Sequence, residues 1–382
     1  MIRDPDILKQ LVDLIERFVR ERLIPLEHQV AEEGKIPDEV IDEMKALGLF
    51  GLTIPEEYGG LGLTMEEEIL VAIALGHTSP AFRSIMGTNN GIGSAAVIFD
   101  GNEEQKKKYL PRYASGEWIS CFCLTEPEAG SDAASLKTSA VRDGDHYLLN
   151  GTKRFITNAK VAHTFNVMAR TNPDIKGARG ISSFIVDSDS PGITLGPVDK
   201  KMGQAGSLTC DVIFEDCRVP ADNLIGEEGG GFITAMKVLD RGRLHISGVA
   251  VGLAQRLIAD ALDYAMQRKQ FGKPIAEQQL IQAMLADSKT EAYAAECMTL
   301  ETARNRDAGG NVSTESAACK YYATEMVGRV ADRAVQIHGG AGYMAEYAVE
   351  RFYRDVRLLR LYEGTSQIQQ LIIARNMIRD AS

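Results

Sequence analysis

Apolar residues recur at helical spacing at the start of the chain. Between residues 7 and 24 they include Leu8, Leu11, Ile15 and Phe18, which would share one face of a helix with 3.6 residues per turn. The pattern predicts an amphipathic helix that ends at Pro25, since proline removes a backbone donor. Further helical stretches are predicted at 37–47, 64–75 and 103–113. The first region is therefore expected to be α-helical.

The hydrophobic period changes near Trp118. Short runs rich in β-forming residues follow at 146–149, 165–169, 183–186 and 211–214, with turn residues between them. Asp143-Gly144-Asp145 and Asn150-Gly151 are typical of hairpin turns. Strands this close together, with no helix between them, predict an antiparallel barrel or sandwich instead of a doubly wound sheet.

The helical period returns after Gly229-Gly230-Gly231 and continues through 232–267, 275–307, 313–338 and 365–378. This pattern predicts a bundle of long helices. Gly339 would end the third of them, and Thr365 or Ser366 would cap the last. The expected fold class is α+β with three domains: a helical domain at 1–118, a β domain at 119–229 and a helical bundle at 230–382.

The composition narrows the function classes. A chain of 382 residues is too long for one hydrophobic core. Its net charge of −11 does not favour binding to nucleic acid or anionic lipid. We find no secretory signal and no apolar run long enough to span a bilayer, so a cytoplasmic protein is expected. The six cysteines and six histidines show no metal-ligand spacing, so we expect no metal site and reduced, mostly buried thiols.

Two glycine-rich segments lack the spacings of nucleotide-binding loops. Neither Gly87 to Gly93 nor Gly339 to Gly342 completes G-x-G-x-x-G or a P-loop, and turns or caps are favoured over phosphate cradles. The loop at 125–132, Thr-Glu-Pro-Glu-Ala-Gly-Ser-Asp, is polar. It is either a domain linker or a holder of a phosphate or a flavin's polar edge.

Charged residues near helix ends are the other candidates. Glu363 precedes a predicted helix and has apolar neighbours, which would raise its proton affinity and suit it to act as a base. The alternative is a carboxylate that only complements the helix dipole. The segment Arg268-Lys269-Gln270-Phe271-Gly272-Lys273 could bind a pyrophosphate or cap a helix C-terminus. Asp240-Arg241-Gly242-Arg243 is interpreted as a solvated helix turn unless an anion binds there.

Taken in order, these segments resemble the acyl-CoA dehydrogenase family over essentially the whole chain. The loop from Cys123 to Asp132 is similar to the family's first signature. The run from Gln336-Ile337-His338-Gly339-Gly340 to Tyr362-Glu363-Gly364-Thr365-Ser366 is similar to its second. The resemblance implies a C-terminal four-helix bundle, a homotetramer, and FAD held partly by a neighbouring subunit.

The resemblance also assigns residues to sites. Those expected around the flavin are Phe122, Leu124, Thr125, Gly130, Ser131, Phe155 and Thr157. Those expected at the FAD of the adjacent subunit are Arg268, Phe271, Gln279, Gln336, Gly339 and Gly340, with Thr365 and Gln367 near the phosphate and ribityl region. Those expected to contact the substrate are Arg83, Ser131, Asp240, Arg243, Tyr362 and Gly364.

The implied reaction removes the α proton of a CoA thioester through Glu363 and sends a hydride from the β carbon to flavin N5, giving a trans-2-enoyl-CoA. Hydrogen bonds from the ribityl hydroxyl and the backbone N–H of Glu363 would polarise the thioester carbonyl. Electrons would pass to an electron-transferring flavoprotein. Position 242 is glycine, which excludes the relatives' other location for the base.

The sequence leaves more than one acyl group possible for the substrate. Arg83 resembles the arginine with which glutaryl-CoA dehydrogenases bind a distal carboxylate, which implies a short dicarboxylyl-CoA, but a surface or structural arginine is equally consistent with the sequence. An acyl-CoA oxidase and a non-catalytic CoA-binding protein are the alternative functions. A nitroalkane oxidase would carry aspartate at position 363.

Overall fold

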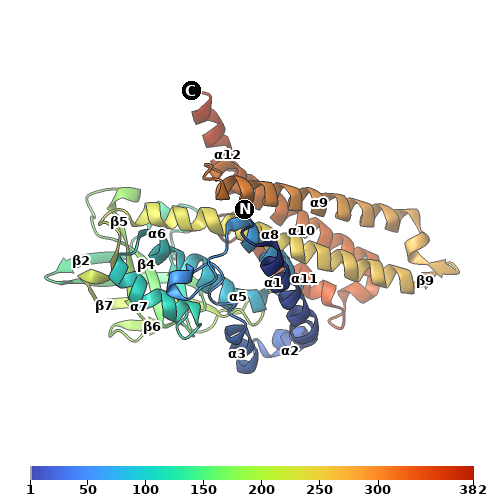
Figure 1. The fold of residues 1–382 in the computed structure, drawn as a ribbon, viewed down its shortest axis with the longest axis horizontal. Coiled ribbons are helices and arrows are strands. Elements are labelled where there is room, and N and C mark those ends of the chain that lie inside the picture. Colours follow the sequence, from blue (N-terminus) through green and yellow to red (C-terminus); the bar gives the residue numbers. More distant parts are fainter. Residues whose placement is uncertain (1) are drawn as a thin grey trace.

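The computed structural model describes residues 2–382 and has three successive parts (Figure 1). Helices form the first part, an eight-stranded sheet the second, and long helices the third. The helices of the first part are α1 (Pro5–Phe18), α2 (Ile24–Glu33), α3 (Asp38–Ala46), α4 (Met65–Leu75), α5 (Pro80–Thr88), α6 (Ala95–Asp100) and α7 (Glu103–Ala114). The helical prediction for this region is confirmed.

Pro25 does not end the first helix, contrary to the prediction. A π-helical turn, Val19–Leu23, connects α1 directly to α2, and Pro25 lies in the first turn of α2. Proline is tolerated there because the first backbone N–H groups of a helix have no intrahelical partner. Val19 and Leu23 stay buried through the π-helical turn and extend the apolar face of α1.

The β domain is one sheet with the order β6-β7-β3-β2-β4-β5-β8, and β1 pairs with β4. The strands are β1 (Ser120–Cys123), β2 (Ser139–Asp143), β3 (His146–Thr157), β4 (Thr164–Arg170), β5 (Ile181–Asp187), β6 (Ile193–Leu195), β7 (Thr209–Pro220) and β8 (Leu224–Ile225). Most pairs are antiparallel as predicted, but β1 and β2 both run parallel to β4.

One of the two predicted hairpin turns is confirmed. Gly144, with φ +64°, lies in the tight turn between β2 and β3. Asn150-Gly151 instead lies inside β3, where the register with β7 shifts between Leu149 and Gly151. A Cβ on Gly151 would come within 2.6 Å of the Thr138 hydroxyl. This dipeptide therefore serves a β-bulge and a close approach to Thr138, just before β2, not a chain reversal.

The third part is built around α8 (Gly231–Gln267), which runs from the sheet to the far end of the molecule (Figure 1). It packs against α4, α9 and α10. The other elements are β9 (Lys269–Gln270), β10 (Lys273–Pro274), α9 (Gln279–Asp307), α10 (Ser313–His338), α11 (Ala348–Val356) and α12 (Ser366–Asp380). Gly339, with φ +59°, ends α10, and the Thr365 side chain caps α12, both as predicted.

The segment from Gly87 to Gly93 is helical, so its interpretation as a turn or cap is wrong. It covers the end of α5 and a π-helical turn, Asn89–Gly93. A Cβ on Gly87 would lie 2.5 Å from Arg83 Nε, and one on Gly93 would lie 2.6 Å from the Ser120 carbonyl oxygen. Gly87 therefore leaves room for the Arg83 side chain of its own helix, and Gly93 allows close packing against the start of β1.

The cysteines are all free, and five of the six are buried; Cys297 is exposed. This confirms the expectation of mostly buried thiols. Within residues 2–382, no helix combines the length and the apolar character needed to cross a bilayer.

Candidate active site

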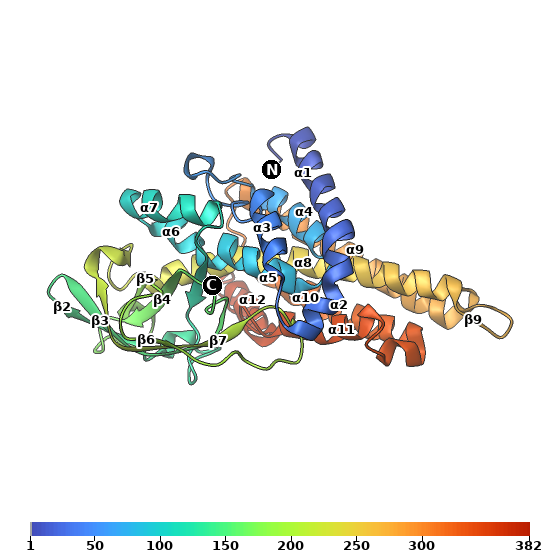
Figure 2. The same ribbon diagram turned by 90° about the horizontal axis from the view of Figure 1, so that it is seen from below.

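The main cavity has a volume of about 770 Å³ and is lined by all three parts of the chain. It brings together most of the predicted flavin and substrate residues. The predicted residues that line it are Arg83, Phe122, Leu124, Thr125, Gly130, Ser131, Phe155, Thr157, Arg243, Tyr362, Glu363 and Gly364. Residues of α5, α8 and α12 line this cavity together with residues of the sheet, and Figure 2 shows the sheet to one side of the helices.

A second group of predicted residues lies elsewhere. Arg268, Phe271, Gln279, Gly339 and Gly340 line a groove at the far end of the helical bundle, which we call the bundle-end groove. The Phe271 side chain is almost wholly exposed there, at 94%.

Four predicted residues line neither space. Gln336 is exposed on α10, and Thr365 and Gln367 lie at the start of α12, next to the cavity-lining Gly364 and Ile368. Asp240, on α8, forms an ion pair with Arg243.

Glu363 is held in an uncommon backbone conformation at the cavity wall. Its φ is +53°, in the left-handed region that non-glycine residues rarely adopt, and Gly364 follows at +89°. The Gln369 side-chain amide donates to the carbonyl oxygens of Glu363, at 3.2 Å, and Gly364, at 2.9 Å. Lys320 Nζ also donates to the Gly364 carbonyl oxygen, at 2.7 Å. Side chains from two helices thus fix the backbone that carries the carboxylate.

The carboxylate of Glu363 points toward α8. A Cβ on Gly242 would lie 2.2 Å from Glu363 Oε2, so only glycine leaves room for the carboxylate in this position. Oε2 is buried and has no hydrogen-bond partner among the residues that the structure describes. A buried oxygen without a partner costs free energy, and such atoms are typical of sites that bind or react with a ligand.

Burial raises the pKa of Glu363, while the positive charges of Arg83, Lys320 and Arg243 act in the opposite direction. Lys320 is fully buried, and burial lowers its pKa to about 8. A carboxylate whose pKa is raised by burial and limited by nearby cations can be ionised at neutral pH and still accept a proton readily.

The other wall of the cavity presents free polar groups and an aromatic ring. The hydroxyls of Thr125, Ser131 and Thr157 make no hydrogen bond to any other part of residues 2–382. A Cβ on Gly130 would meet nothing within 4 Å, so open space borders the loop. Hydroxyls that face open space suit the polar edge of a flat heterocycle, and this donor set fits a flavin.

Phe155 has φ +58°, which is a genuine outlier for a bulky residue. The strand is bulged there, because the register between β3 and β7 shifts between Lys153 and Ile156. The bulge leaves the ring 58% exposed at the cavity. A strained residue that presents an aromatic surface to a cavity indicates a binding role.

A buried ion pair anchors the loop at 125–132 to the sheet. Lys153 Nζ lies 2.8 Å from Glu126 Oε1, and both side chains are almost wholly buried. Glu126 also accepts hydrogen bonds from the backbone N–H groups of Lys137 and Thr138. The loop is therefore a fixed part of the β domain, and its interpretation as a simple domain linker does not hold.

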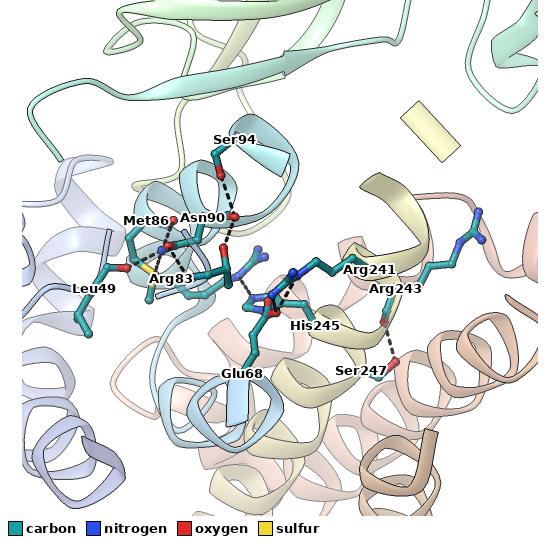
Figure 3. Close-up of polar contacts among 11 residues, drawn as sticks. Leu49, Glu68, Arg83, Met86, Asn90, Ser94, Arg241, Arg243, His245 and Ser247 are labelled. Atoms are coloured by element: carbon teal, nitrogen blue, oxygen red, sulfur yellow. Dashed lines mark hydrogen bonds and ion pairs between the residues drawn. The ribbon is translucent and has the colours of Figure 1, made fainter. Parts of the chain in front are cut away.

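Arg83 is buried, so it is not a surface arginine. Its Nε donates to His245 Nε2 at 2.9 Å, and His245 Nδ1 lies 2.9 Å from Glu68 Oε1 (Figure 3). Arg241 Nη2 lies 2.7 Å from Glu68 Oε2. Arg241 and Arg243 are largely buried, so the interpretation of residues 240–243 as a solvated helix turn is wrong.

A small second pocket adjoins the main cavity behind Glu363, and we call it the arginine pocket. Its volume is about 10 Å³, room for about one water molecule. It is lined by Glu68, Arg83, Gly87, Thr88, Gly91, Ile92, Val238, Arg241, Gly242, His245 and Glu363. Sequence reasoning missed Glu68, His245 and Lys320 as site residues, because none lies in a recognisable motif.

Comparisons with known proteins agree with this architecture. Family models match residues 6–117 (acyl-CoA dehydrogenase, N-terminal domain), 121–217 (middle domain) and 229–378 (C-terminal domain). An acyl-CoA dehydrogenase of Bacillus subtilis is 41% identical over 365 residues, which are 96% of each chain. A subunit of the caffeyl-CoA reductase-Etf complex of Acetobacterium woodii is 42% identical over 351 residues, which are 92% of each chain.

Solved structures are equally similar. Butyryl-CoA dehydrogenase from Megasphaera elsdenii has a TM-score of 0.95 at 35% identity and covers 99% of this chain and 100% of its own. A glutaryl-CoA dehydrogenase in complex with glutaryl-CoA has a TM-score of 0.93 at 33% identity and covers 99% of this chain and 96% of its own. An acyl-CoA dehydrogenase from Bacillus anthracis complexed with FAD has a TM-score of 0.93 at 37% identity and covers 99% of this chain and 68% of its own. This chain belongs to the acyl-CoA dehydrogenase family.

Proposed function

We propose that the protein is a flavin-dependent acyl-CoA dehydrogenase that forms a trans-2-enoyl-CoA, with Glu363 as the base. The observation that carries this proposal is the Glu363 carboxylate: Oε2 is buried without a partner beside a cavity large enough for a ring system and a substrate. The cavity would lie where three proposed domains meet, at residues 1–118, 119–229 and 230–382.

The residues of the main cavity would hold the isoalloxazine of FAD. Thr125, Ser131 and Thr157 offer hydroxyls to its polar edge, and Phe155 offers an aromatic surface. The bundle-end groove, with Arg268 and Phe271, would hold part of the FAD of a neighbouring copy in a homotetramer. When bound, FAD supplies the acceptor for the hydride that leaves the β carbon.

Glu363 would take the proton from the α carbon of the thioester, so that the C–H electron pair becomes part of the new double bond. The carboxylate is charged before the transfer and neutral after it. Burial favours the neutral product, while Arg83, Lys320 and Arg243 keep the reactant form accessible. The backbone N–H of Glu363 has no acceptor within residues 2–382 and is free to polarise the thioester carbonyl.

Replacement of the base tests the proposal directly. Glu363→Gln should keep the fold and the flavin absorbance but slow anaerobic bleaching by acyl-CoA by about 10²–10⁴-fold, the usual contribution of a general base. Glu104→Gln, at an exposed position on α7, is the matched control and should bleach normally. Full-rate bleaching of Glu363→Gln would exclude the assignment.

Two rival functions predict different results in the same experiment. An acyl-CoA oxidase would form peroxide in air after reduction, whereas the proposed enzyme would pass electrons to an electron-transferring flavoprotein. The resemblance to a subunit of an Etf complex supports that acceptor. A non-catalytic CoA-binding protein would be colourless, or would hold a flavin that no thioester bleaches.

The second candidate function is narrower: dehydrogenation of a short dicarboxylyl-CoA. Arg83 favours it, because this guanidinium is buried, borders both the main cavity and the arginine pocket, and uses only Nε in hydrogen bonding among the described residues. The similarity to a glutaryl-CoA dehydrogenase agrees with this reading.

A further inference from the structure

Four side chains form a continuous buried chain of contacts behind Glu363 (Figure 3). Arg83 comes from α5, Glu68 from α4, and Arg241 and His245 from α8, one helical turn apart. The contacts run from Arg83 Nε to His245 Nε2, from His245 Nδ1 to Glu68 Oε1, and from Glu68 Oε2 to Arg241, each between 2.7 and 2.9 Å. At the centre, Glu68 is 2% and His245 8% exposed.

The donors and acceptors of this chain are matched in only one way. Arginine always donates, so His245 Nε2 must accept and carry no proton. The imidazole proton therefore lies on Nδ1 and is donated to Glu68. Burial acts to raise the pKa of Glu68, but Arg241 and His245 lower it to about 2, so Glu68 is an ionised acceptor. Burial and Arg83 lower the pKa of His245, which keeps the imidazole neutral.

This arrangement fixes the plane of the Arg83 guanidinium. The hydrogen bond from Nε leaves both terminal nitrogens free of partners within residues 2–382, and Arg83 lines the main cavity and the arginine pocket. Gly87 contributes to the placement, because a Cβ there would lie 2.5 Å from Nε and 3.0 Å from Cζ. A guanidinium held by Nε presents a planar pair of donors, the geometry that binds a carboxylate.

We propose that Glu68 and His245 are positioning residues that hold Arg83 so that its terminal nitrogens bind a carboxylate at the end of a short acyl chain. The inference rests on the proposed dehydrogenase function and deepens it, since it makes substrate selectivity depend on residues that do not touch the substrate. Without these contacts Arg83 would be a flexible cation. The hydrogen bonds from Arg83 to His245 and from His245 to Glu68 fix the orientation of the guanidinium.

The test compares two five-carbon thioesters, glutaryl-CoA and pentanoyl-CoA, which differ mainly in the distal carboxylate. In His245→Phe, which keeps a ring but removes the acceptor, KM for glutaryl-CoA should rise at least tenfold. Measured above the acid limb of the pH–rate profile, where Glu363 stays ionised even if Arg83 moves, the kcat/KM for pentanoyl-CoA should stay within about threefold. His245→Gln can still offer an oxygen to Arg83 Nε and should restore much of the selectivity, which a purely structural role would not produce.

Gly87→Ala provides a second route, because it displaces the Arg83 guanidinium without touching His245 and adds a good helix former. It should lower the selectivity for glutaryl-CoA in the same way, with flavin content and melting temperature unchanged. Equal losses with both thioesters in Gly87→Ala and His245→Phe would overturn the inference, as would a wild-type enzyme that oxidises pentanoyl-CoA but not glutaryl-CoA. A wild type that no thioester bleaches would instead overturn the dehydrogenase proposal.

Discussion

Gly242→Ala should inactivate the enzyme while leaving its fold intact. The new Cβ would lie 2.2 Å from Glu363 Oε2 and 3.2 Å from its carboxylate carbon. Ordinary contact begins near 3.4 Å, so the oxygen must move by about 1.2 Å. The carboxylate is the far end of a flexible side chain and can rotate away, which spares the backbone. A displacement of about 1 Å at a reacting group costs about 10²-fold in rate.

The stability of the fold should stay the same or increase slightly, although the rate of the reaction falls. Gly242 lies inside α8 with an ordinary helical backbone, where alanine is favoured over glycine by up to about 1 kcal/mol. The melting temperature should therefore be equal or slightly higher, and the flavin should remain bound. Gly248→Ala, on the same helix, is the matched control, because its Cβ would meet its nearest neighbour at 3.2 Å and requires only a small adjustment.

The assay is anaerobic stopped-flow bleaching of the flavin by the preferred thioester. We expect a rate about 10²-fold below wild type in Gly242→Ala and a near-normal rate in Gly248→Ala. A Gly242→Ala enzyme that bleaches at the wild-type rate would refute the reasoning, because it would mean that the position of the Glu363 carboxylate does not limit the reaction.

Three further predictions concern charge. Lys320→Met removes a cation that lowers the pKa of Glu363, so the acid limb of the pH–rate profile for bleaching should move to higher pH; an unmoved limb would argue against the coupling. Lys153→Met leaves Glu126 buried without its ionic partner, so the free energy of unfolding from chemical denaturation should fall by about 3–5 kcal/mol. A fall below about 1 kcal/mol would contradict this prediction. Burial raises the pKa of Asp355 to about 6, so this group favours the folded state below its unfolded value of 3.8, and that contribution is lost as pH rises to about 6. Asp355→Asn should therefore raise the melting temperature at pH 8 and change it little at pH 4; destabilisation at pH 8 would be the contrary result.

The parts of the site that could be predicted from sequence are those carried by continuous segments. The loop around Thr125 and the residues around Glu363 each form a motif, and the structure places both at one cavity. The order of helices, strands and helices followed from hydrophobic periods, which reflect burial on one face. Their catalytic and binding roles stay predictions, as do the homotetramer, the electron acceptor and the cytoplasmic location.

The remaining features depend on packing between distant segments. His245 meets Arg83 across 162 positions and Glu68 across 177, and a lone histidine in a helix gives no indication of such partners. Lys320 reaches Gly364 only because α10 packs against the segment before α12. The predicted helix end at Pro25 was wrong because a π-helical turn carries the helix on to this proline. The predicted hairpin turn at Asn150-Gly151 was wrong because a bulge accommodates this dipeptide inside β3.

The length of α8 has a genetic consequence. Gly242 lies at the arginine pocket, beside the main cavity, and Arg268 at the bundle-end groove, and the 26-residue step between them along α8 spans about 39 Å. One extended dinucleotide does not bridge that distance, so under the proposed assembly each complete centre combines the cavity of one copy with the groove of another. Two defective alleles, one altered at Glu363 and one at Arg268, would then complement each other when co-expressed, because mixed assemblies contain some centres built from two intact halves.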